Sequence, residues 1–304
     1  MSLLIVGSIA LDNVKTPFGE HQNILGGSAI HASNAASFFS SVNLVGVVGK
    51  DFPTEHLHFL KKRNIDTSGI QIKKGKTFHW EGYYEYDMNQ AHTLKTDLNV
   101  FADFDPIIPD NYKDSEFVFL ANIDPTLQLK VLQQIKKPKF IMLDTMNFWI
   151  ETKKDILLKA INSVDLLVLN DAEARQFIDT PNLIKAAQEL LATGVKKVII
   201  KKGEHGAILF EKDNVFVAPS YPLEKIIDPT GAGDSFAGGL IGYLSKTNDL
   251  SHANLRKAII TGTAMASFNV EDFSLNRLKS LTKTEITKRI KKLKNITDFE
   301  LSEI

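Results

Sequence analysis

The 304-residue sequence contains no cysteine, which excludes disulfide bonds, thiol catalysis and cysteine-ligated metals. It also has no excess charge, because 36 lysine and arginine residues balance 36 aspartate and glutamate residues. No net electric field therefore attracts nucleic acid or a membrane surface. No apolar run approaches the length of a transmembrane helix, and the N-terminus lacks the basic and apolar regions of a signal peptide. We expect a cytoplasmic protein without nucleic-acid or membrane partners.

The chain does contain regularly spaced apolar runs, which are typical of buried strands. After residue 116, predicted strands alternate with predicted helices, and this alternation favours parallel βαβ winding. The length allows one large core. We therefore predict a single α/β domain over residues 1–304. The clearest strand predictions are residues 3–6, 42–48, 117–120, 140–143, 166–169 and 195–200.

The most informative stretch is a glycine-rich segment, residues 228–234, between a short apolar pair and a helical pattern. Ile226-Ile227 predicts the end of a buried strand, and apolar residues at 236, 240 and 244 mark one face of a helix. Gly231 and Gly233 can adopt positive φ and allow a ligand to approach the backbone. Free N–H groups at a helix start, with the helix dipole, bind anions. The segment reads Asp228-Pro229-Thr230-Gly231-Ala232-Gly233-Asp234.

Asp234 admits two interpretations at this turn. As an ordinary capping carboxylate it would only stabilise the start of the helix. A carboxylate inside an anion-binding turn would instead compete with a phosphate, which indicates a base beside a transferred phosphoryl group. The Gly-Ala-Gly-Asp spacing alone favours the capping interpretation.

The full stretch, continuing into Ser235 and Phe236, resembles the C-terminal signature of the ribokinase-like (PfkB) carbohydrate and nucleoside kinases. In that family the Gly-Ala-Gly backbone forms an anion hole and the final aspartate deprotonates the acceptor hydroxyl. The resemblance implies an α/β fold with three αβα layers, a mostly parallel central sheet and a small β lid. It also implies ATP and Mg²⁺ as cofactors. By resemblance, the catalytic roles fall to Gly231, Ala232, Gly233 and Asp234.

An N-terminal group of residues is predicted to bind the substrate. Asp12 follows the first strand, where open α/β sheets bind ligands, although a carboxylate in a solvent-exposed loop fits equally well. Gly26 and Gly27 precede a helix and resemble the family's sugar-contacting glycine pair, but also suit a simple turn. His31 stands where many members have asparagine, and Asn34 follows about one turn later. The resemblance assigns all five residues to the substrate site.

A lid is predicted from two segments, residues of about 11–25 and 74–100. The stretch 77–86 is aromatic and rich in β-forming residues, which fits a lid and an ordinary surface hairpin equally well. A lid would exclude water from the phosphoryl group. Trp80 and Tyr83, together with His31 and Ser28, are the predicted selectivity residues. In related proteins the lid sheet often pairs two subunits, so a homodimer through the lid is implied.

The nucleotide site is predicted by resemblance. Asn170 and Glu173 match the family's Asn-x-x-Glu element, which organises magnesium, here through water. A helix N-cap and its capping box predict the same two residues, and both interpretations can hold. Lys202 and Gly203 follow a strand and match the family's nucleotide-side hairpin. The predicted ATP-binding residues are Asn170, Lys202, Gly203, Thr230, Gly231 and Gly233.

Three further segments complete the predicted elements. Residues 64–69 predict a turn before a short strand at 70–72. Residues 251–268 form an amphipathic pattern that predicts a helix. Thr282, with Glu285 three residues later, predicts the capped start of a last, basic helix that ends near residue 294.

These patterns predict an ATP-dependent, Mg²⁺-assisted kinase that transfers the γ-phosphoryl group to a hydroxyl of a sugar, a sugar derivative or a nucleoside. A kinase of a vitamin-like alcohol is one alternative, but the glycine pair and the aromatic lid favour a sugar or nucleoside. A non-catalytic ligand-binding protein of the same fold is another. Asp234 argues against it, because a pure binding protein needs no base there. The identity of the acceptor does not follow from the sequence.

Overall fold

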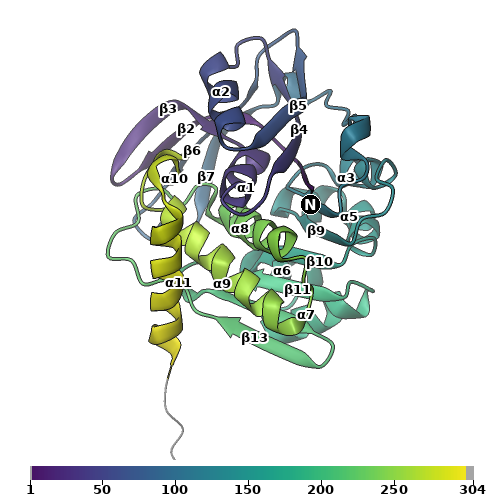
Figure 1. The fold of residues 1–304 in the computed structure, drawn as a ribbon, viewed down its shortest axis with the longest axis vertical. Helices are drawn as coiled ribbons and strands as arrows, with labels where there is room; N and C mark the ends of the chain where they lie inside the picture. The colour runs from purple at the N-terminus through teal and green to yellow at the C-terminus, as the bar shows by residue number, and fades with distance from the viewer. Residues whose placement is uncertain (1, 299–304) are drawn as a thin grey trace, which may run out of the picture.

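The computed structural model describes residues 2–298, and most of its strands belong to one large sheet (Figure 1). These strands are β1 (Leu3–Val6), β4 (Val42–Gly49), β5 (Ile65–Lys73), β8 (Phe117–Leu120), β9 (Phe140–Asp144), β10 (Leu166–Asn170), β11 (Lys197–Lys201), β12 (Ala207–Glu211) and β13 (Asn214–Ala218). Their order in this nine-stranded sheet is β13-β12-β11-β10-β9-β8-β1-β4-β5. Neighbours from β11 to β5 pair in parallel, and β12 and β13 are antiparallel. The carboxyl ends of the parallel strands therefore share one edge.

The central strands are short apolar runs because both of their faces are covered by helices. All four residues of β1 have no exposed surface. Leu3 and Ile5 join one apolar cluster, whereas Leu4 and Val6 join a second cluster on the other face. This alternation divides the core into two halves, one on each side of the sheet.

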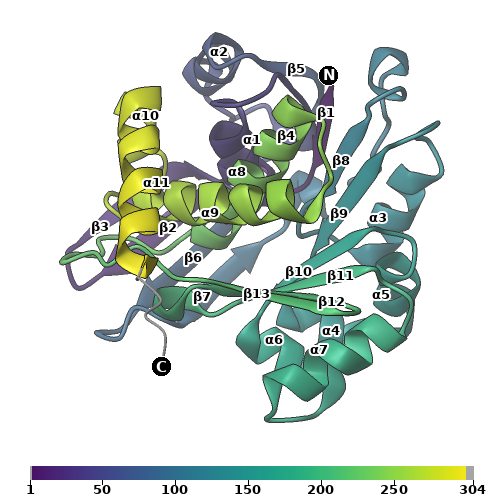
Figure 2. The same ribbon diagram turned by 60° about the horizontal axis from the view of Figure 1, so that its bottom comes forward.

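Helices cover both faces and give three layers, which Figure 2 shows from the side of β13. One face carries α1 (Ser28–Ala36), α2 (Thr54–Lys62), α8 (Ala232–Thr247), α9 (His252–Asn269), α10 (Asn276–Ser280) and α11 (Lys283–Thr297). The other carries α3 (Pro125–Leu132), α4 (Asn147–Thr152), α5 (Lys154–Ile161), α6 (Asp171–Ile178) and α7 (Leu183–Ala192). Three 3₁₀ turns are η1 (Asn99–Phe101), η2 (Asp110–Tyr112) and η3 (Gly203–His205). The three-layer, mostly parallel prediction is confirmed.

A second, four-stranded sheet stands apart from the first, in the order β3-β2-β6-β7. Its strands are β2 (Ala10–Thr16), β3 (Gly19–Gly26), β6 (Phe78–Tyr84) and β7 (Ala91–Asp97), which lie in the two segments predicted to form the lid. Most residues of β2 are buried, while most of β3 and β7 is exposed. Closure of this sheet over a substrate and pairing of two subunits through it stay predictions.

Two local predictions are wrong. Ile226-Ile227 is not the end of a strand; the pair is half-buried in an irregular segment, where the Ile227 N–H donates to Val270 O at 2.8 Å. This apolar pair therefore lies against the end of α9 and does not belong to a strand. Residues 64–69 are not all turn, because β5 begins at Ile65 and pairs in parallel with β4 from Val42 onward. Partner-strand pairing overrides the polar composition of this segment.

The two predicted C-terminal helices are confirmed. Ser251 caps α9, and its side chain accepts from the Asn254 N–H. Thr282 and Glu285 form the capping box of α11, which runs to Thr297, a little beyond the predicted end. Within residues 2–298, no helix combines the length and the apolar character needed to cross a membrane.

Candidate active site

The glycine-rich segment forms the turn that starts α8. Gly231 is the N-cap residue, with φ 73° in the left-handed region that favours glycine. A Cβ on Gly231 would lie 2.3 Å from the ring of His31, so the imidazole packs directly against this turn. The helical face predicted from residues 236, 240 and 244 is buried. The turn is therefore fixed between the core and α1.

Buried polar side chains hold the turn in place. Asp228 accepts hydrogen bonds from the N–H groups of Thr230 (2.9 Å) and Ser274 (3.2 Å). The Asn269 amide donates to Thr230 O at 2.8 Å, and its Oδ1 accepts from Ser235 Oγ at 2.9 Å. These bonds tie the turn to the end of α9 and the loop after it.

His31 shares the same amide oxygen. Its Nδ1 lies 3.1 Å from Asn269 Oδ1. Because the Asn269 amide nitrogen donates to a carbonyl, its oxygen is an acceptor, and Nδ1 of His31 carries the hydrogen. Burial lowers the pKa of His31 to about 4, against the opposing effect of Asn269. The imidazole is therefore neutral at pH 7, with the hydrogen on Nδ1.

Asp234 lies in the first turn of α8. Burial, reinforced by the charge of Asp144, raises its pKa to about 7, while Lys201 opposes the shift. A carboxylate with a pKa near neutrality suits a general base. In the Gly-Ala-Gly segment that is predicted to bind an anion, the Ala232 N–H donates to Pro229 O at 3.1 Å.

Asn170 and Glu173 form the predicted capping box at the start of α6. Asn170 Oδ1 accepts from the Glu173 N–H at 2.8 Å, and Glu173 Oε2 accepts from the Asn170 N–H at 2.7 Å. Burial raises the pKa of Glu173 to about 7; Lys201 opposes this, and Asp144 and Asp234 add to it. The capping interpretation is confirmed, and the carboxylate also belongs to a group of interacting charges.

This group fits a hydrated magnesium ion. Within the described residues, no three histidine or acidic side chains lie together closely enough to hold a metal alone. Mg²⁺ usually keeps several waters and binds few protein carboxylates together with phosphate oxygens. The carboxylates of Glu173, which is buried, and of Asp234, which is half-buried, interact electrostatically and supply hard oxygen ligands of this kind.

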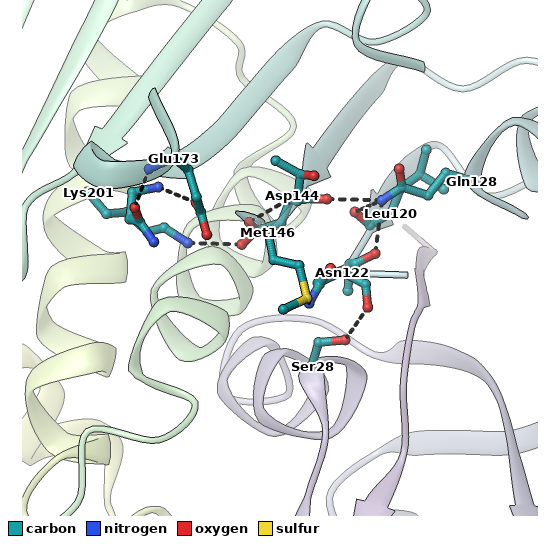
Figure 3. A network of polar contacts seen from close by, with 11 residues as sticks. Ser28, Leu120, Asn122, Gln128, Asp144, Met146, Glu173 and Lys201 are labelled. Carbon is teal, nitrogen blue, oxygen red and sulfur yellow. Dashed lines mark hydrogen bonds and ion pairs between the residues drawn. The ribbon is translucent and has the colours of Figure 1, made fainter. Parts of the chain in front are cut away.

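Lys201 is a site residue that the sequence interpretation missed. Its Nζ lies 3.0 Å from Asp144 Oδ2 (Figure 3). A Cβ on Gly233 would lie 3.0 Å from the same nitrogen. The predicted ATP-binding residues Lys202 and Gly203 begin the following turn, where Lys202 N–H donates to Gly206 O at 2.7 Å. The available signal was strand alternation, because Lys201 is in phase with Ile199, which packs toward α8.

Asp12, the first of the predicted substrate residues, lies on β2 and not in a solvent-exposed loop. Its side chain is buried, and Oδ1 has no hydrogen-bond partner. Burial raises the pKa of Asp12 to about 8, and the charges of Asp228 and Asp234 add to the shift. The carboxylate is therefore near enough to Asp234 to interact with it.

Gly26 and Gly27 are each required for a different structural reason. A Cβ on Gly26 would lie 1.8 Å from Asp12 Oδ2, so this position leaves room for the carboxylate. Gly27 is the N-cap of α1 with φ 97°, and a Cβ there would lie 2.5 Å from Ser8 O. Asn34 lies further along α1, fully buried, and neither amide atom has a hydrogen-bond partner. Its contact with substrate stays a prediction.

The second sheet reaches the turn through Tyr84, another residue that the sequence interpretation missed. Its hydroxyl lies 3.3 Å from Thr230 Oγ1. Burial and the nearby Asp228, Asp12 and Asp234 raise the pKa of Tyr84, against the Thr230 hydrogen bond. Tyr83 instead stacks on His92 at 4.9 Å. Trp80 pairs with Asp12 and Tyr83 pairs with exposed Lys15 across the β2–β6 ladder, so Trp80, and not Tyr83, shares the face of Asp12.

The sequence model of the pfkB family of carbohydrate kinases matches residues 7–280. The chain belongs to this family. It is 31% identical over 257 residues to the cytidine kinase of Thermococcus kodakarensis, covering 82% of this chain and 91% of that protein. It is also 31% identical over 230 residues to the nucleoside kinase of Methanocaldococcus jannaschii, covering 75% of this chain and 72% of that protein.

Solved structures agree with the pfkB family fold. The crystal structure of the M. jannaschii nucleoside kinase superposes with a TM-score of 0.76 at 22% identity, covering 96% of this chain and 98% of that one. A putative ribokinase II from E. coli gives a TM-score of 0.80 at 18% identity, covering 96% and 99%. Membership confirms the resemblance and the predicted enzyme class, a phosphotransferase with an alcohol group as acceptor.

Proposed function

We propose that the chain transfers the γ-phosphoryl group of ATP to a sugar hydroxyl of a nucleoside, with Asp234 as the general base. The observation that carries this proposal is the position of Asp234 in the first turn of α8, directly after the left-handed Gly231, where its carboxylate interacts electrostatically with that of Asp12. The cytidine and nucleoside kinases described above support the nucleoside as acceptor.

The site then has two ends. The phosphate end consists of Asp144, Glu173, Lys201 and residues 231–234, and the acceptor end consists of Asp12, Gly26, Gly27 and His31. Asp12 accepts a hydrogen bond from a substrate hydroxyl, because its buried Oδ1 otherwise has no partner. The turn places its N–H groups and the α8 dipole beside the phosphoryl group. The predicted nucleotide contacts of Asn170, Lys202, Gly203 and Thr230 belong to this proposal.

The reaction needs one proton transfer in the protein. The acceptor oxygen forms a bond to the γ-phosphorus, and the bond from that phosphorus to the bridging oxygen of ADP breaks. Asp234 takes the hydroxyl proton, and its raised pKa of about 7 matches this role. Glu173, with Asp234, would hold Mg²⁺ through water. When bound, the ion neutralises charge on the phosphate oxygens. The second sheet would exclude water from the site.

The main alternative within this enzyme class is a sugar or another alcohol as acceptor. A relative at 27% identity over 297 residues is the inositol 3-kinase of Arabidopsis thaliana. A non-catalytic ligand-binding role does not account for a half-buried carboxylate in the turn with a pKa near neutrality. A homodimer through the exposed face of the second sheet, where Leu94 is 62% exposed, stays a prediction.

An ADP-release screen tests the proposal. The purified chain is supplied with ATP, Mg²⁺ and, in separate reactions, cytidine, adenosine, inosine, ribose, fructose and inositol. We expect nucleosides to give the highest kcat/KM. ADP release with a free sugar or inositol but with no nucleoside would contradict the acceptor class. ADP release with none of them would contradict the proposed function.

A further inference from the structure

Lys201 and Lys197 form two ion pairs on one strand. In β11 the residues Lys197, Ile199 and Lys201 alternate and share one face of the sheet. Lys201 Nζ lies 3.0 Å from Asp144 Oδ2, with the side chains 18% and 5% exposed. Lys197 Nζ lies 2.9 Å from Glu211 Oε1, with the side chains 22% and 7% exposed. The pairs match in length and burial, and they lie at opposite ends of the strand.

Only the Lys201 pair lies at an anion-binding turn. A Cβ on Gly233 would come within 3.0 Å of Lys201 Nζ, so the ammonium lies against the backbone of residues 231–234 where the side chain of Gly233 is absent. Lys197 contacts no such turn; its carboxylate partner Glu211 is shared with His252 at the start of α9. The same kind of ion pair therefore has different surroundings at the two ends.

Lys201 supplies positive charge on this wall of the turn. Its ammonium is paired with Asp144, and Glu173 and Asp234 also interact with it electrostatically. A phosphate that reaches the turn therefore meets the Lys201 ammonium in addition to the N–H groups of α8.

Asp144 is itself held in position by the network in Figure 3. Its Oδ1 accepts from the Thr145 N–H at 2.7 Å, which leaves Oδ2 for Lys201. Its backbone oxygen accepts from Gln128 Nε2 at 3.0 Å, and the same nitrogen contacts Ala121 O at 3.1 Å. Gln128 thereby joins the carboxyl ends of β8 and β9, and Asp144 has little freedom to follow a moving lysine.

We propose that Lys201 binds the γ-phosphoryl group during transfer and that Asp144 is the positioning residue that holds its ammonium at the turn. This inference rests on the proposed function and names a cation for it. Lys201 keeps its proton, while Asp234 takes that of the acceptor. A charge-assisted hydrogen bond to the phosphoryl oxygens strengthens as charge develops in the transition state.

The test compares Lys201→Gln with the matched control Lys197→Gln. Glutamine keeps a hydrogen-bond donor for the carboxylate partner and removes the charge. We expect Lys201→Gln to lower kcat about 10²–10³-fold, the typical loss for one transition-state donor. Affinity for β,γ-imido-ATP should fall about tenfold or more while affinity for ADP, which lacks the γ-phosphate, stays unchanged. Lys197→Gln should lower the melting temperature to a similar extent and leave kcat and both affinities unchanged.

The double variant Asp144→Asn/Lys201→Gln tests the positioning role. Asp144→Asn alone should lower kcat less than Lys201→Gln, and the double variant should be no slower than Lys201→Gln, because Asp144 acts through the lysine. Additive losses would contradict this role. Equal effects of the Lys201 and Lys197 variants, or an unchanged imido-ATP to ADP affinity ratio in Lys201→Gln, would overturn the phosphoryl contact.

The binding ratio separates this inference from the proposed function. If the wild-type protein binds both nucleotides but phosphorylates no acceptor, only the proposed function is contradicted. The ratio of imido-ATP affinity to ADP affinity in Lys201→Gln still tests whether Lys201 contacts the γ-phosphoryl group. Wild-type protein that binds neither nucleotide contradicts both. Should Lys201→Gln fail to fold, Lys201→Arg and Lys201→Met are compared instead. Lys201→Arg keeps the positive charge and is expected to retain more activity than Lys201→Met, which removes it. Equal activity of these two variants would contradict the phosphoryl contact.

Discussion

At the phosphate end of the site, Asp144 binds the Lys201 ammonium and the Glu173 carboxylate accepts from the Asn170 N–H. At the proposed acceptor end, Asp12 Oδ1 is buried without a partner, and burial together with neighbouring carboxylates raises the pKa of Asp12 to about 8. The side chains of the phosphate end are thus paired before any ligand arrives, whereas one buried carboxylate oxygen of the acceptor end has no donor. Under the proposed function, the acceptor, and not the nucleotide, supplies the missing donor when it binds.

The largest expected effect comes from Asp234→Asn, which removes the base that acts where the two ends meet. Loss of a positioned base typically lowers the rate about 10²–10⁴-fold. ATP affinity should hold or rise, because a negative charge beside the phosphates is removed. Steady-state kinetics, nucleotide titration and a melting curve measure the three quantities. A folded variant with nearly the parent kcat would show that Asp234 only stabilises the start of α8.

Asp12→Asn tests the unpaired acceptor end. We expect kcat/KM for the acceptor to fall about 10- to 100-fold, since hydrogen bonds to charged groups contribute about 1.5–3 kcal/mol. The apo-protein should nevertheless become more stable. The pKa of Asp12 is raised from 3.8 to about 8 in the folded chain, so its stabilising contribution is present at low pH and is lost as pH rises through about 8.

Melting temperatures of parent and Asp12→Asn across pH provide the measurement. The advantage of the variant should grow between about pH 4 and pH 8 and then level off. A variant that melts below the parent at pH 8 would mean that the Asp12 carboxylate is already satisfied in the apo-protein, and the contrast between the two ends would disappear.

Glu173→Gln should raise the Mg²⁺ concentration for half-maximal activity about tenfold or more, as is typical when a group that orients metal ligands is lost. Glutamine also completes a capping box, so the melting temperature should change little. Glu285→Gln is the matched control, because Glu285 completes the capping box of α11 away from the site. Equal magnesium requirements in the two variants would leave Glu173 with a capping role only.

The smallest expected effect is that of Tyr84→Phe, which removes the 3.3 Å contact between the second sheet and Thr230. A single neutral hydrogen bond contributes about 0.5–1.5 kcal/mol, so kcat/KM should fall roughly 2- to 10-fold. Tyr83→Phe provides the control from the same strand, because Tyr83 stacks on His92. A larger loss of kcat/KM in Tyr83→Phe than in Tyr84→Phe would indicate that the face of the second sheet that carries Tyr83 is the functional one.

Most strands could be predicted because each central strand is a continuous apolar run that is buried on both faces, as in Leu3–Val6. The helix starts at Asn170 and Thr282 could be predicted because capping is local chemistry. Ile65 could not be assigned to a strand, because its pairing with Val42 depends on a segment distant in the sequence.

The site was predictable where backbone geometry requires glycine, as at Gly231, and where a motif fixes a carboxylate, as at Asp234. Lys201 and Lys202 are adjacent and identical, so only the face of β11 distinguishes them. Tyr83 and Tyr84 pose the same problem on β6. In both pairs the predicted residue, Lys202 or Tyr83, is the neighbour of the one that lies at the turn. Strand alternation, followed from a buried residue of the same strand, distinguishes the two members of each pair.

The packing of the His31 imidazole against Gly231 couples two positions that are 200 residues apart. In this chain the ring fills the space that a side chain on the turn would need, and it shares Asn269 with Ser235. A smaller residue at position 31 would leave a gap under this turn. Under the proposed function, a change at position 31 that is made to alter the acceptor therefore also disturbs the turn that carries Asp234, and it requires a compensating change beside Gly231.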